Sequence, residues 1–204
     1  MRLIVDRLSV MRGDRMVVTQ LTFSVDSGEA LVLTGPNGAG KTTLIRAIAG
    51  LLRPAGGQIR LEGAQPDRTP SEECHYVGHL NGVKANLTVQ ENAAFWSRYL
   101  GGALDAVETA IATFGLVGAR DVPAGYLSAG QRRRLALARL LLAKRPLWLL
   151  DEPTVSLDQA AQELLTEVVD THLASGGLVV AATHAPLGFA KSRELQVGAA
   201  ALAA

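Results

Sequence analysis

The sequence contains only one cysteine, Cys74. A single cysteine excludes an internal disulfide and is typical of a reducing compartment such as the cytoplasm. Hydrophobic residues make up 48% of the chain, yet no apolar run reaches the roughly 18 residues that would suggest a membrane span. The N-terminal segment carries charges at Arg2, Asp6 and Arg7, which predicts that it is neither a secretory nor a transit peptide.

The sequence also lacks an excess of charge of either sign. Its formal net charge is +1, which excludes attraction of the whole domain to nucleic acid or anionic lipid. Any association with a membrane would therefore come from a partner protein. A chain of 204 residues suits one domain with a sizeable core and room for a small subdomain.

Three short apolar runs predict the strands of a parallel sheet. They are ALVLT at 30–34, LWLL at 147–150 and LVVAA at 178–182. Each run is continuous rather than alternating and ends in a polar or glycine turn, as strands buried on both faces do. The first two are followed by a turn and a helical pattern, so we expect an α/β core. Residues 3–10 and 17–25 alternate more, which predicts antiparallel strands with one solvent-facing side.

The middle of the sequence, roughly residues 87–144, shows no convincing strand pattern. Helical patterns fill it instead, at residues 88–100, 104–114 and 129–144. We therefore predict one domain over residues 1–204. Its α/β core, with a mixed sheet and N-terminal antiparallel strands, would cover about 1–83 and 146–204, and a helical subdomain would be inserted at about 84–145.

A glycine-rich loop follows the first predicted parallel strand. The segment GPNGAGKTT matches G-x-x-x-x-G-K-[ST] between a strand and a helix, which is the phosphate-binding P-loop. Its glycines let the backbone curve so that N–H groups face the phosphates. Lys41 would reach the β- and γ-phosphates, and the Thr42 hydroxyl would bind Mg²⁺. The residues expected around the nucleotide are Gly35, Pro36, Asn37, Gly38, Ala39, Gly40, Lys41, Thr42 and Thr43.

Two acidic residues follow the second predicted parallel strand. Asp151 would lie at the carboxyl end of this strand, where ligands of open α/β sheets bind. We expect it to contribute to the Mg²⁺ shell through water. Glu152, one residue further on, is placed to polarise an attacking water. Alone the pair could be a solvated turn, but with the phosphate loop it indicates Mg²⁺-dependent hydrolysis of a nucleoside triphosphate such as ATP.

A third segment, LSAGQ at 127–131, indicates which class of nucleotide-hydrolysing protein this is. Ser128 and Gln131 have capping-box spacing, so this segment should begin a helix. A helix start with a serine hydroxyl and a glycine beside it is a second phosphate-binding end. Here the chain resembles the ATP-binding subunits of ABC transporters, which carry the motif LSGGQ at this place. In this chain Ala129 replaces the first glycine of that motif. The resemblance covers nearly the whole chain, and the motifs come in the family's order.

The resemblance implies roles for several further residues. In such proteins two subunits pair head to tail, so Ser128, Gly130 and Gln131 would act on ATP held by the other subunit. Asp158, in the D-loop SLD, would couple the two sites, and His184 would contact the γ-phosphate. From position alone, a histidine after a buried strand is more often a cap or a surface residue. The residues implied to be catalytic are Lys41, Glu152 and His184. One such chain therefore implies a homodimer with two composite ATP sites.

Two positions depart from the usual pattern. Arg12 stands where transporter ATPases usually carry the aromatic residue on which adenine stacks. A guanidinium plane can also stack on a base, and a plain surface arginine is the open alternative. His79 stands where these proteins usually present a glutamine that touches the Mg²⁺ site under the groove for the membrane subunit. Histidine can hydrogen-bond to a metal-bound water, so His79 is a candidate metal-site residue.

The segments YVGH, LTVQEN and LSAGQ resemble one branch of this family in particular. It comprises the haem-exporter ATP-binding subunits of cytochrome c maturation, which usually carry a glutamine where this chain has Leu80. The resemblance implies an ATPase that drives integral membrane subunits at the cytoplasmic face of the cell membrane. It leaves open whether haem is moved or a haem-loaded chaperone is released.

Other functions are compatible with parts of the sequence. An exporter of a lipid or drug would have identical catalytic residues. Soluble ABC ATPases of translation or DNA repair resemble two cassettes in one chain or a cassette split by a coiled coil, and neither feature is present. Intact Lys41, Glu152 and His184 argue against a non-catalytic nucleotide-binding module. The arginines at 132–134 are interpreted as a solvated helix face, so no nucleic-acid partner is expected.

Overall fold

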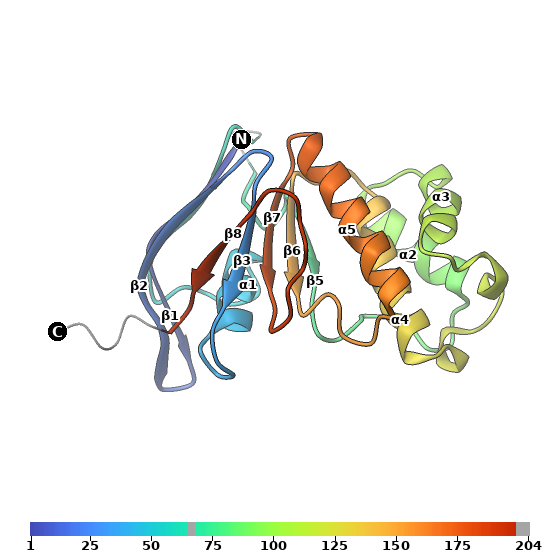
Figure 1. The fold of residues 1–204 in the computed structure, drawn as a ribbon, viewed down its shortest axis with the longest axis horizontal. Helices are drawn as coiled ribbons and strands as arrows, with labels where there is room; N and C mark the ends of the chain where they lie inside the picture. The colour runs from blue at the N-terminus through green and yellow to red at the C-terminus, as the bar shows by residue number, and fades with distance from the viewer. Residues whose placement is uncertain (65–67, 199–204) are drawn as a thin grey trace.

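The computed structural model describes residues 1–64 and 68–198 and contains two sheets (Figure 1). The first sheet is antiparallel, in the order β2 (Arg15–Asp26), β1 (Arg2–Arg12) and β4 (Gly56–Glu62). The second is parallel, in the order β5 (Cys74–Val77), β6 (Leu147–Asp151), β7 (Leu178–Ala182), β3 (Ala30–Thr34) and β8 (Ser192–Gln196). The predicted α/β class is confirmed, and the two strand directions lie in separate sheets.

The α-helices cover the parallel sheet and extend beyond it. They are α1 (Lys41–Ile48), α2 (Val89–Leu100), α3 (Asp105–Thr113), α4 (Ala129–Ala138) and α5 (Gln159–Ala174). The helix predicted at 129–144 was too long, because α4 ends at Ala138 and continues as one 3₁₀ turn, Arg139–Leu141. Such turns are common where a helix ends. Two further 3₁₀ turns, Val117–Ala119 and Ala124–Tyr126, connect α3 to α4.

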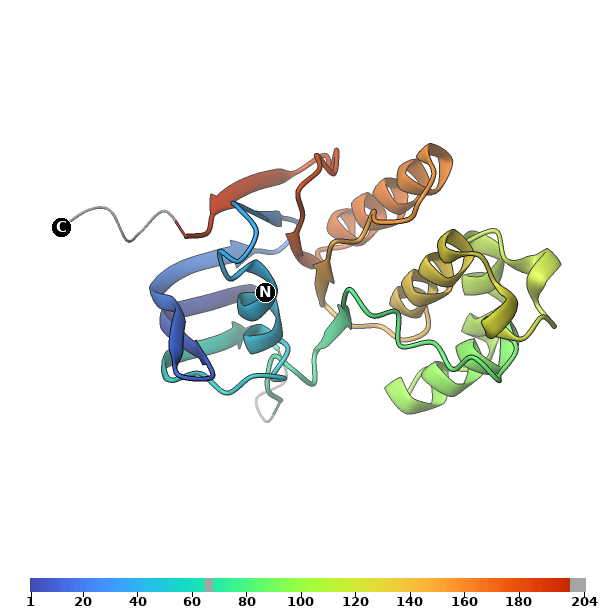
Figure 2. The same ribbon diagram turned by 90° about the horizontal axis from the view of Figure 1, so that it is seen from below.

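Both faces of the parallel sheet are buried at its three central strands, β6, β7 and β3, which explains the continuous apolar runs. Leu31 and Leu33 of β3 pack with α1 and the antiparallel sheet, while Ala30 and Val32 pack on the side of α5. All five residues of β6 and of β7 are buried. The core therefore has layers in the order antiparallel sheet, α1, parallel sheet and α5 (Figures 1 and 2). This leaves the carboxyl ends of the parallel strands as the edge on which a site can be built.

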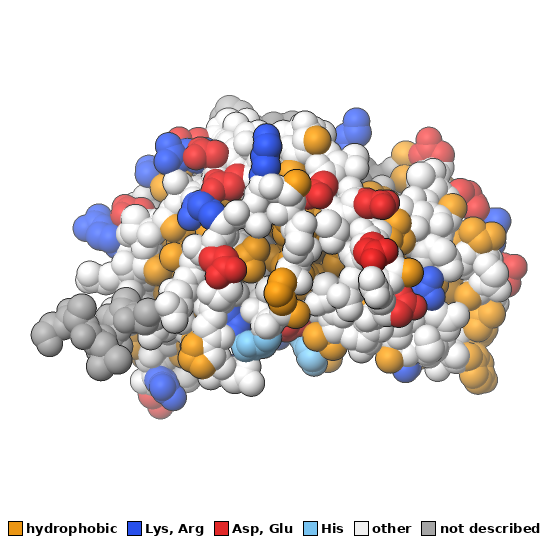
Figure 3. Space-filling model, viewed as in Figure 1, with side chains coloured by type: hydrophobic (Ala, Val, Ile, Leu, Met, Phe, Trp, Pro, Cys, Tyr) orange, Lys and Arg blue, Asp and Glu red, His pale blue; other side chains and the backbone are white. Residues whose placement is uncertain are grey.

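Helices α2, α3 and α4 lie together at the end of the molecule away from the antiparallel sheet (Figure 2). We propose that they form the helical subdomain predicted at about 84–145. The predicted core was about 1–83 and 146–204, of which residues 65–67 and 199–204 lie outside the described residues. Acidic and basic side chains are interspersed on the face in Figure 3, while hydrophobic side chains gather at this helical end. Large exposed hydrophobic residues of this segment are Tyr99, Leu104, Val117 and Tyr126.

Two histidines away from the strand ends are held in their neutral form. His75 in β5 donates from Nε2 to the Ala143 carbonyl oxygen at 2.7 Å, and burial lowers its pKa to about 4. His172 in α5 stacks on Trp148 with the ring centroids 3.8 Å apart, and burial lowers its pKa to about 4 as well. Folding therefore favours the neutral form of both imidazoles.

We expect acid to destabilise the fold through these histidines. The unfolded chain takes up protons near pH 6.5 and the folded chain only near the lowered pKa of about 4. The free energy of unfolding should thus fall between pH 7.5 and 5, by on the order of 2 kcal/mol per histidine. Urea unfolding at the two pH values measures it. His75→Asn, which stays neutral, should lose about half of this pH dependence, and an unchanged pH dependence would contradict the assignment.

Candidate functional site

The carboxyl ends of the parallel strands open into a cavity of about 1140 Å³. Its wall is built by the loop before α1, the β1–β2 hairpin, the loop after β5 and the segments after β6 and β7. The predicted site residues on this wall are Arg12, Asn37, Gly38, Ala39, Gly40, Lys41, Thr42, Thr43, His79, Glu152 and His184. The structure thus brings together residues from five separate parts of the sequence.

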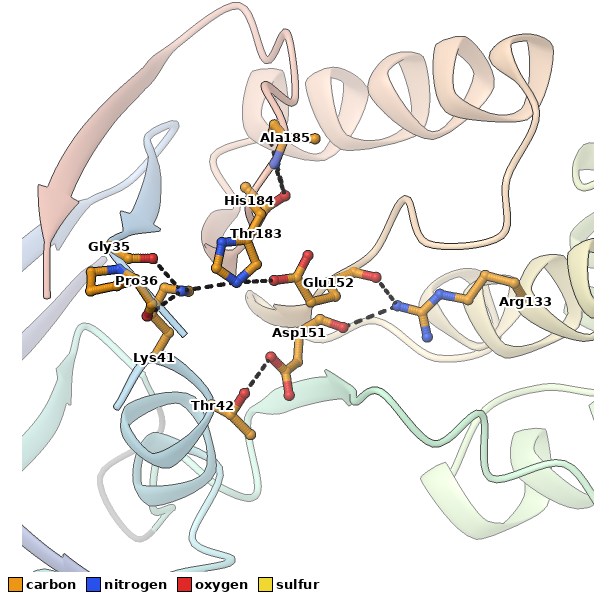
Figure 4. Close-up of polar contacts among 10 residues, drawn as sticks. All are labelled: Gly35, Pro36, Lys41, Thr42, Arg133, Asp151, Glu152, Thr183, His184 and Ala185. Atoms are coloured by element: carbon orange, nitrogen blue, oxygen red, sulfur yellow. Dashed lines mark hydrogen bonds and ion pairs between the residues drawn. The ribbon is translucent and has the colours of Figure 1, made fainter. Parts of the chain in front are cut away.

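The glycine-rich loop curves tightly into α1. Gly40 caps the helix with a φ of 103°, and a Cβ atom there would lie 2.9 Å from the Val17 side chain, so only glycine fits. Lys41 is buried at the start of α1, and its Nζ donates to the carbonyl oxygens of Gly35 at 2.6 Å and Pro36 at 3.2 Å (Figure 4). The loop therefore holds the ammonium group of Lys41 against its own backbone, next to the N-terminus of α1, which favours anions.

The Thr42 hydroxyl donates to Oδ1 of Asp151 at 2.9 Å (Figure 4). Asp151 is buried at the end of β6, and among the described residues its Oδ2 atom has no hydrogen-bond partner. A buried carboxylate oxygen without a partner is costly unless a bound group satisfies it. A hydroxyl and a carboxylate are the hard oxygen donors that Mg²⁺ prefers. The pair therefore fits a Mg²⁺ ion.

No cluster of three or more histidine, cysteine or acidic side chains that could hold a metal occurs at residues 1–64 and 68–198. Mg²⁺ usually takes one or two carboxylates from a protein and completes its shell with water and substrate phosphates. His79 is also on the cavity wall. Its imidazole nitrogen is a less suitable direct ligand for Mg²⁺ than an oxygen.

Glu152 follows β6 in an unusual backbone conformation. Its φ is 49°, in the left-handed region that residues other than glycine rarely adopt. Its N–H donates to the Ala182 carbonyl oxygen at 2.8 Å, which joins it to β7. Its Oε1 atom lies 3.5 Å from Nε2 of His184 (Figure 4). The left-handed turn thus directs a carboxylate into the cavity.

His184 lies between Glu152 and the ammonium of Lys41. Its Nε2 atom is 3.2 Å from Nζ of Lys41. The turn that carries His184 is fixed by Thr183, whose hydroxyl donates to the Ala185 carbonyl oxygen and accepts from the Ala185 N–H, both at 3.0 Å. Nε2 can accept from the ammonium or, when protonated, donate to the carboxylate. The imidazole can therefore form hydrogen bonds of either kind inside the cavity.

The residues of LSAGQ lie at the start of α4, away from this cavity wall. The predicted capping box is confirmed, because Ser128 Oγ accepts from the Gln131 N–H at 3.1 Å and Gln131 Oε1 accepts from the Ser128 N–H at 2.9 Å. Gly130 approaches the Ser156 carbonyl oxygen so closely that a Cβ atom would lie 3.0 Å from it. Asp158 caps α5 by accepting from the Ala161 N–H at 2.9 Å.

The interpretation of the three arginines at 132–134 as a solvated face was wrong for the middle one. Arg132 is exposed, and Arg134 is partly exposed and donates to the carbonyl oxygens of Phe114 and Gly115. Arg133 is buried and donates to backbone near the ends of β5 and β6. Burial lowers the pKa of Arg133, and the nearby charges of Asp151 and Glu152 oppose that shift.

Arg12 lies at the end of β1, next to the hairpin turn where it pairs with Arg15 in β2. Both arginines are exposed and lie on the cavity wall. The structure thus places Arg12 beside the phosphate loop, where a base stacked on it would lie in the same cavity as the phosphates. Stacking itself stays a prediction.

The fold and this cavity define a class of protein, and comparisons with known proteins agree. Residues 18–155 match the family model described as ABC transporter. A solved structure titled as the ATP binding subunit of an ABC transporter superposes with a TM-score of 0.83 at 25% identity, covering 97% of this chain and 88% of that one. The chain belongs to the ABC transporter family of ATP-binding proteins.

Within this family, several curated proteins that are similar over nearly the whole chain carry the same name. The "Cytochrome c biogenesis ATP-binding export protein CcmA" of Rhodopseudomonas palustris (strain BisB5) is 53% identical, over 95% of this chain and 96% of the relative. The protein of the same name from Agrobacterium fabrum is 50% identical, over 97% and 95%. The predicted resemblance to the cytochrome c maturation branch is thereby confirmed. Across the described part of the chain, no helix is long and apolar enough to cross a membrane.

Proposed function

We propose that the chain hydrolyses ATP to ADP and phosphate as the energy-supplying subunit of a membrane transporter. The observation that carries this proposal is the convergence of Lys41, the Thr42–Asp151 pair, Glu152 and His184 on one cavity. A cation, two hard oxygen ligands, a carboxylate and an imidazole are the groups that phosphoryl transfer to water requires. Membership of the ABC transporter family supports ATP as the nucleotide.

Each of these residues has a proposed role in the reaction. The curved loop from Gly35 to Thr43 binds the phosphates with its N–H groups, and Lys41 neutralises the β- and γ-phosphate charge. Thr42 and Asp151 would hold Mg²⁺, which when bound supplies electrostatic stabilisation of the phosphate oxygens. His79 would hydrogen-bond to this ion's water rather than bind it directly.

Glu152 and His184 are proposed to act on the attacking water and the γ-phosphate. Glu152 reaches into the cavity from a backbone that is tied to β7, so its carboxylate is held ready to accept a proton. His184 donates to a γ-phosphate oxygen from the turn fixed by Thr183. Its contact with Lys41 keeps both groups at the end of the cavity where this phosphate would lie.

We propose that two copies of the chain form the complete sites. Ser128, Gly130 and Gln131 do not line their own subunit's cavity, so they would reach ATP only when it is held by a second copy. Gln131 would act by keeping the Ser128 cap in place, since its side chain is already bonded there. Asp158, exposed at the start of α5, would contact the second copy and couple the two sites.

The biological role is proposed from the similar proteins. Their printed name joins ATP binding, export and cytochrome c biogenesis. We propose that this chain binds integral membrane transporter subunits at the cytoplasmic face of the cell membrane. There, its ATP hydrolysis would drive haem export or release of a haem-loaded chaperone during cytochrome c assembly.

Co-purification from membranes tests the role. We expect the tagged chain, expressed in its own host, to retain integral membrane subunits in mild detergent and to hydrolyse ATP several-fold faster in that complex. Deleting its gene should abolish accumulation of haem-bearing c-type cytochromes, and the parent gene should restore it. If the complex forms but the cytochromes are unaffected, the chain serves an exporter of another substrate, such as a lipid or drug.

A further inference from the structure

Arg133 is a buried cation whose side chain contacts two separate segments of the fold. It lies in the second turn of α4, five residues after Ser128, and only 3% of its surface is exposed. Its guanidinium reaches the loop after β5 and the segment after β6. The five bonds run from Nη1 to Gly78 O (2.8 Å) and Asn81 Oδ1 (3.1 Å), from Nη2 to Asp151 O (3.1 Å) and Glu152 O (2.7 Å), and from Nε to Pro153 O (3.1 Å).

These bonds use the whole hydrogen-bonding capacity of the side chain. A guanidinium has five N–H groups in a rigid planar fork, and each has one acceptor here. The acceptors on the first loop, Gly78 and Asn81, lie on either side of His79 in the sequence. The acceptors on the second segment are three consecutive carbonyl groups centred on Glu152. The rigid guanidinium therefore fixes the distance between the two segments that carry His79 and Glu152 to the cavity.

Burial of this charge is costly for folding alone. Among residues 1–64 and 68–198, no carboxylate bonds to the guanidinium. Removing a cation from water costs several kcal/mol unless carbonyl dipoles and nearby charges compensate. An apolar residue here would avoid this cost, but it would leave the carbonyl oxygens of residues 78 and 151–153 without this donor. What the buried arginine supplies, at this cost, is a fixed link between the two segments.

Resting on the ATPase function proposed above, we infer that Arg133 is a positioning residue for catalysis: it holds the left-handed Glu152 backbone and the His79 loop in register with the start of α4. Glu152 has a φ of 49°, a conformation that persists only when its surroundings enforce it. The 2.7 Å bond to the Glu152 carbonyl is the shortest of the five and supplies this constraint. A misplacement of about 1 Å at a reacting group can cost roughly 100-fold in rate.

Arg133→Met tests this inference, with Arg134→Met as the matched control. Methionine fills similar space but donates no hydrogen bonds. Within the described part of the chain, Arg134 bonds only to the carbonyl oxygens of Phe114 and Gly115, away from the cavity. We expect kcat of R133M to fall about 30- to 100-fold while its KM for ATP stays within about threefold, because the phosphate loop is untouched. R134M should keep kcat within about twofold, and melting temperatures of both variants report any loss of stability.

Hydrogen exchange gives a second readout that does not depend on turnover. In R133M, amides at 78–82 and 151–155 should exchange at least about tenfold faster than in the parent, and in R134M they should not. If R133M fails to fold, Arg133→Lys serves instead, since one ammonium cannot reach all five acceptors and kcat should again fall. Parent-like kcat and exchange in the folded variant would overturn the inference. If the parent shows no ATPase activity, the proposed function fails, and exchange alone decides the role of Arg133.

Discussion

Glu152→Gln is expected to lower kcat for ATP hydrolysis by about 10²- to 10⁴-fold, the usual contribution of a general base. Glutamine keeps the size and shape of the side chain but cannot accept the proton of the attacking water. ATP binding should remain, because the phosphate loop and the Thr42–Asp151 pair are unchanged. We expect ATP to accumulate in a closed dimer, since the bound nucleotide is no longer hydrolysed.

Two measurements check this outcome for Glu152→Gln. Steady-state phosphate release gives kcat, and size-exclusion chromatography with ATP shows whether a dimer forms and persists. Glu163→Gln is the control, because Glu163 is exposed on α5 and its carboxylate only accepts from Gln159. The same charge is removed there without touching the cavity. Hydrolysis by Glu152→Gln at the parent rate would mean that another residue is the base.

Lys41→Ala should abolish measurable nucleotide binding, weakening affinity for ATP by about 10²-fold or more. Truncating one partner of a buried, hydrogen-bonded charge pair typically costs 2–5 kcal/mol, and about 1.4 kcal/mol corresponds to a factor of ten. Here the loss has two parts. The charge facing the phosphates disappears, and so do the bonds from Nζ to the Gly35 and Pro36 carbonyl oxygens that hold the loop closed.

Titration with a fluorescent ATP analogue measures the affinity of Lys41→Ala. Lys144→Ala is a suitable control, because Lys144 is exposed and lies in the connector before β6, away from this cavity. Parent-like affinity and turnover in Lys41→Ala would refute the assignment of the phosphate loop. A fall in melting temperature alone, with binding intact, would show that the lysine only shapes the loop.

The structural features that could be predicted from the sequence are those that depend on consecutive residues. The phosphate loop is one unbroken motif, and strands buried on both faces need apolar residues at every position, so β3, β6 and β7 were found. The capping box at Ser128 lies within four consecutive residues, and it is confirmed. In each case the structure requires particular residue types at positions that are close together in the sequence.

The strands β4 and β8 had no such signal. GGQIRLE and SRELQ are polar, mostly exposed segments at sheet edges, so pairing with a neighbour rather than burial makes them strands. Arg133 was misinterpreted for a related reason. Four of its five acceptors are backbone carbonyl groups, which every residue has, and they come from two distant segments. Nothing in the local pattern of α4 distinguishes this buried arginine from its exposed neighbour Arg132.

The left-handed backbone at Glu152 brings folding stability and the carboxylate side chain into conflict. Glycine and asparagine adopt this conformation at little cost, whereas glutamate does so at a cost of about 1–3 kcal/mol. Changes at this one codon that make the chain more stable are thus the ones that remove the carboxylate. Under the role proposed for Glu152, a change at this position that relieves the strained backbone would therefore also abolish ATP hydrolysis, so the glutamate gives up folding stability in favour of turnover.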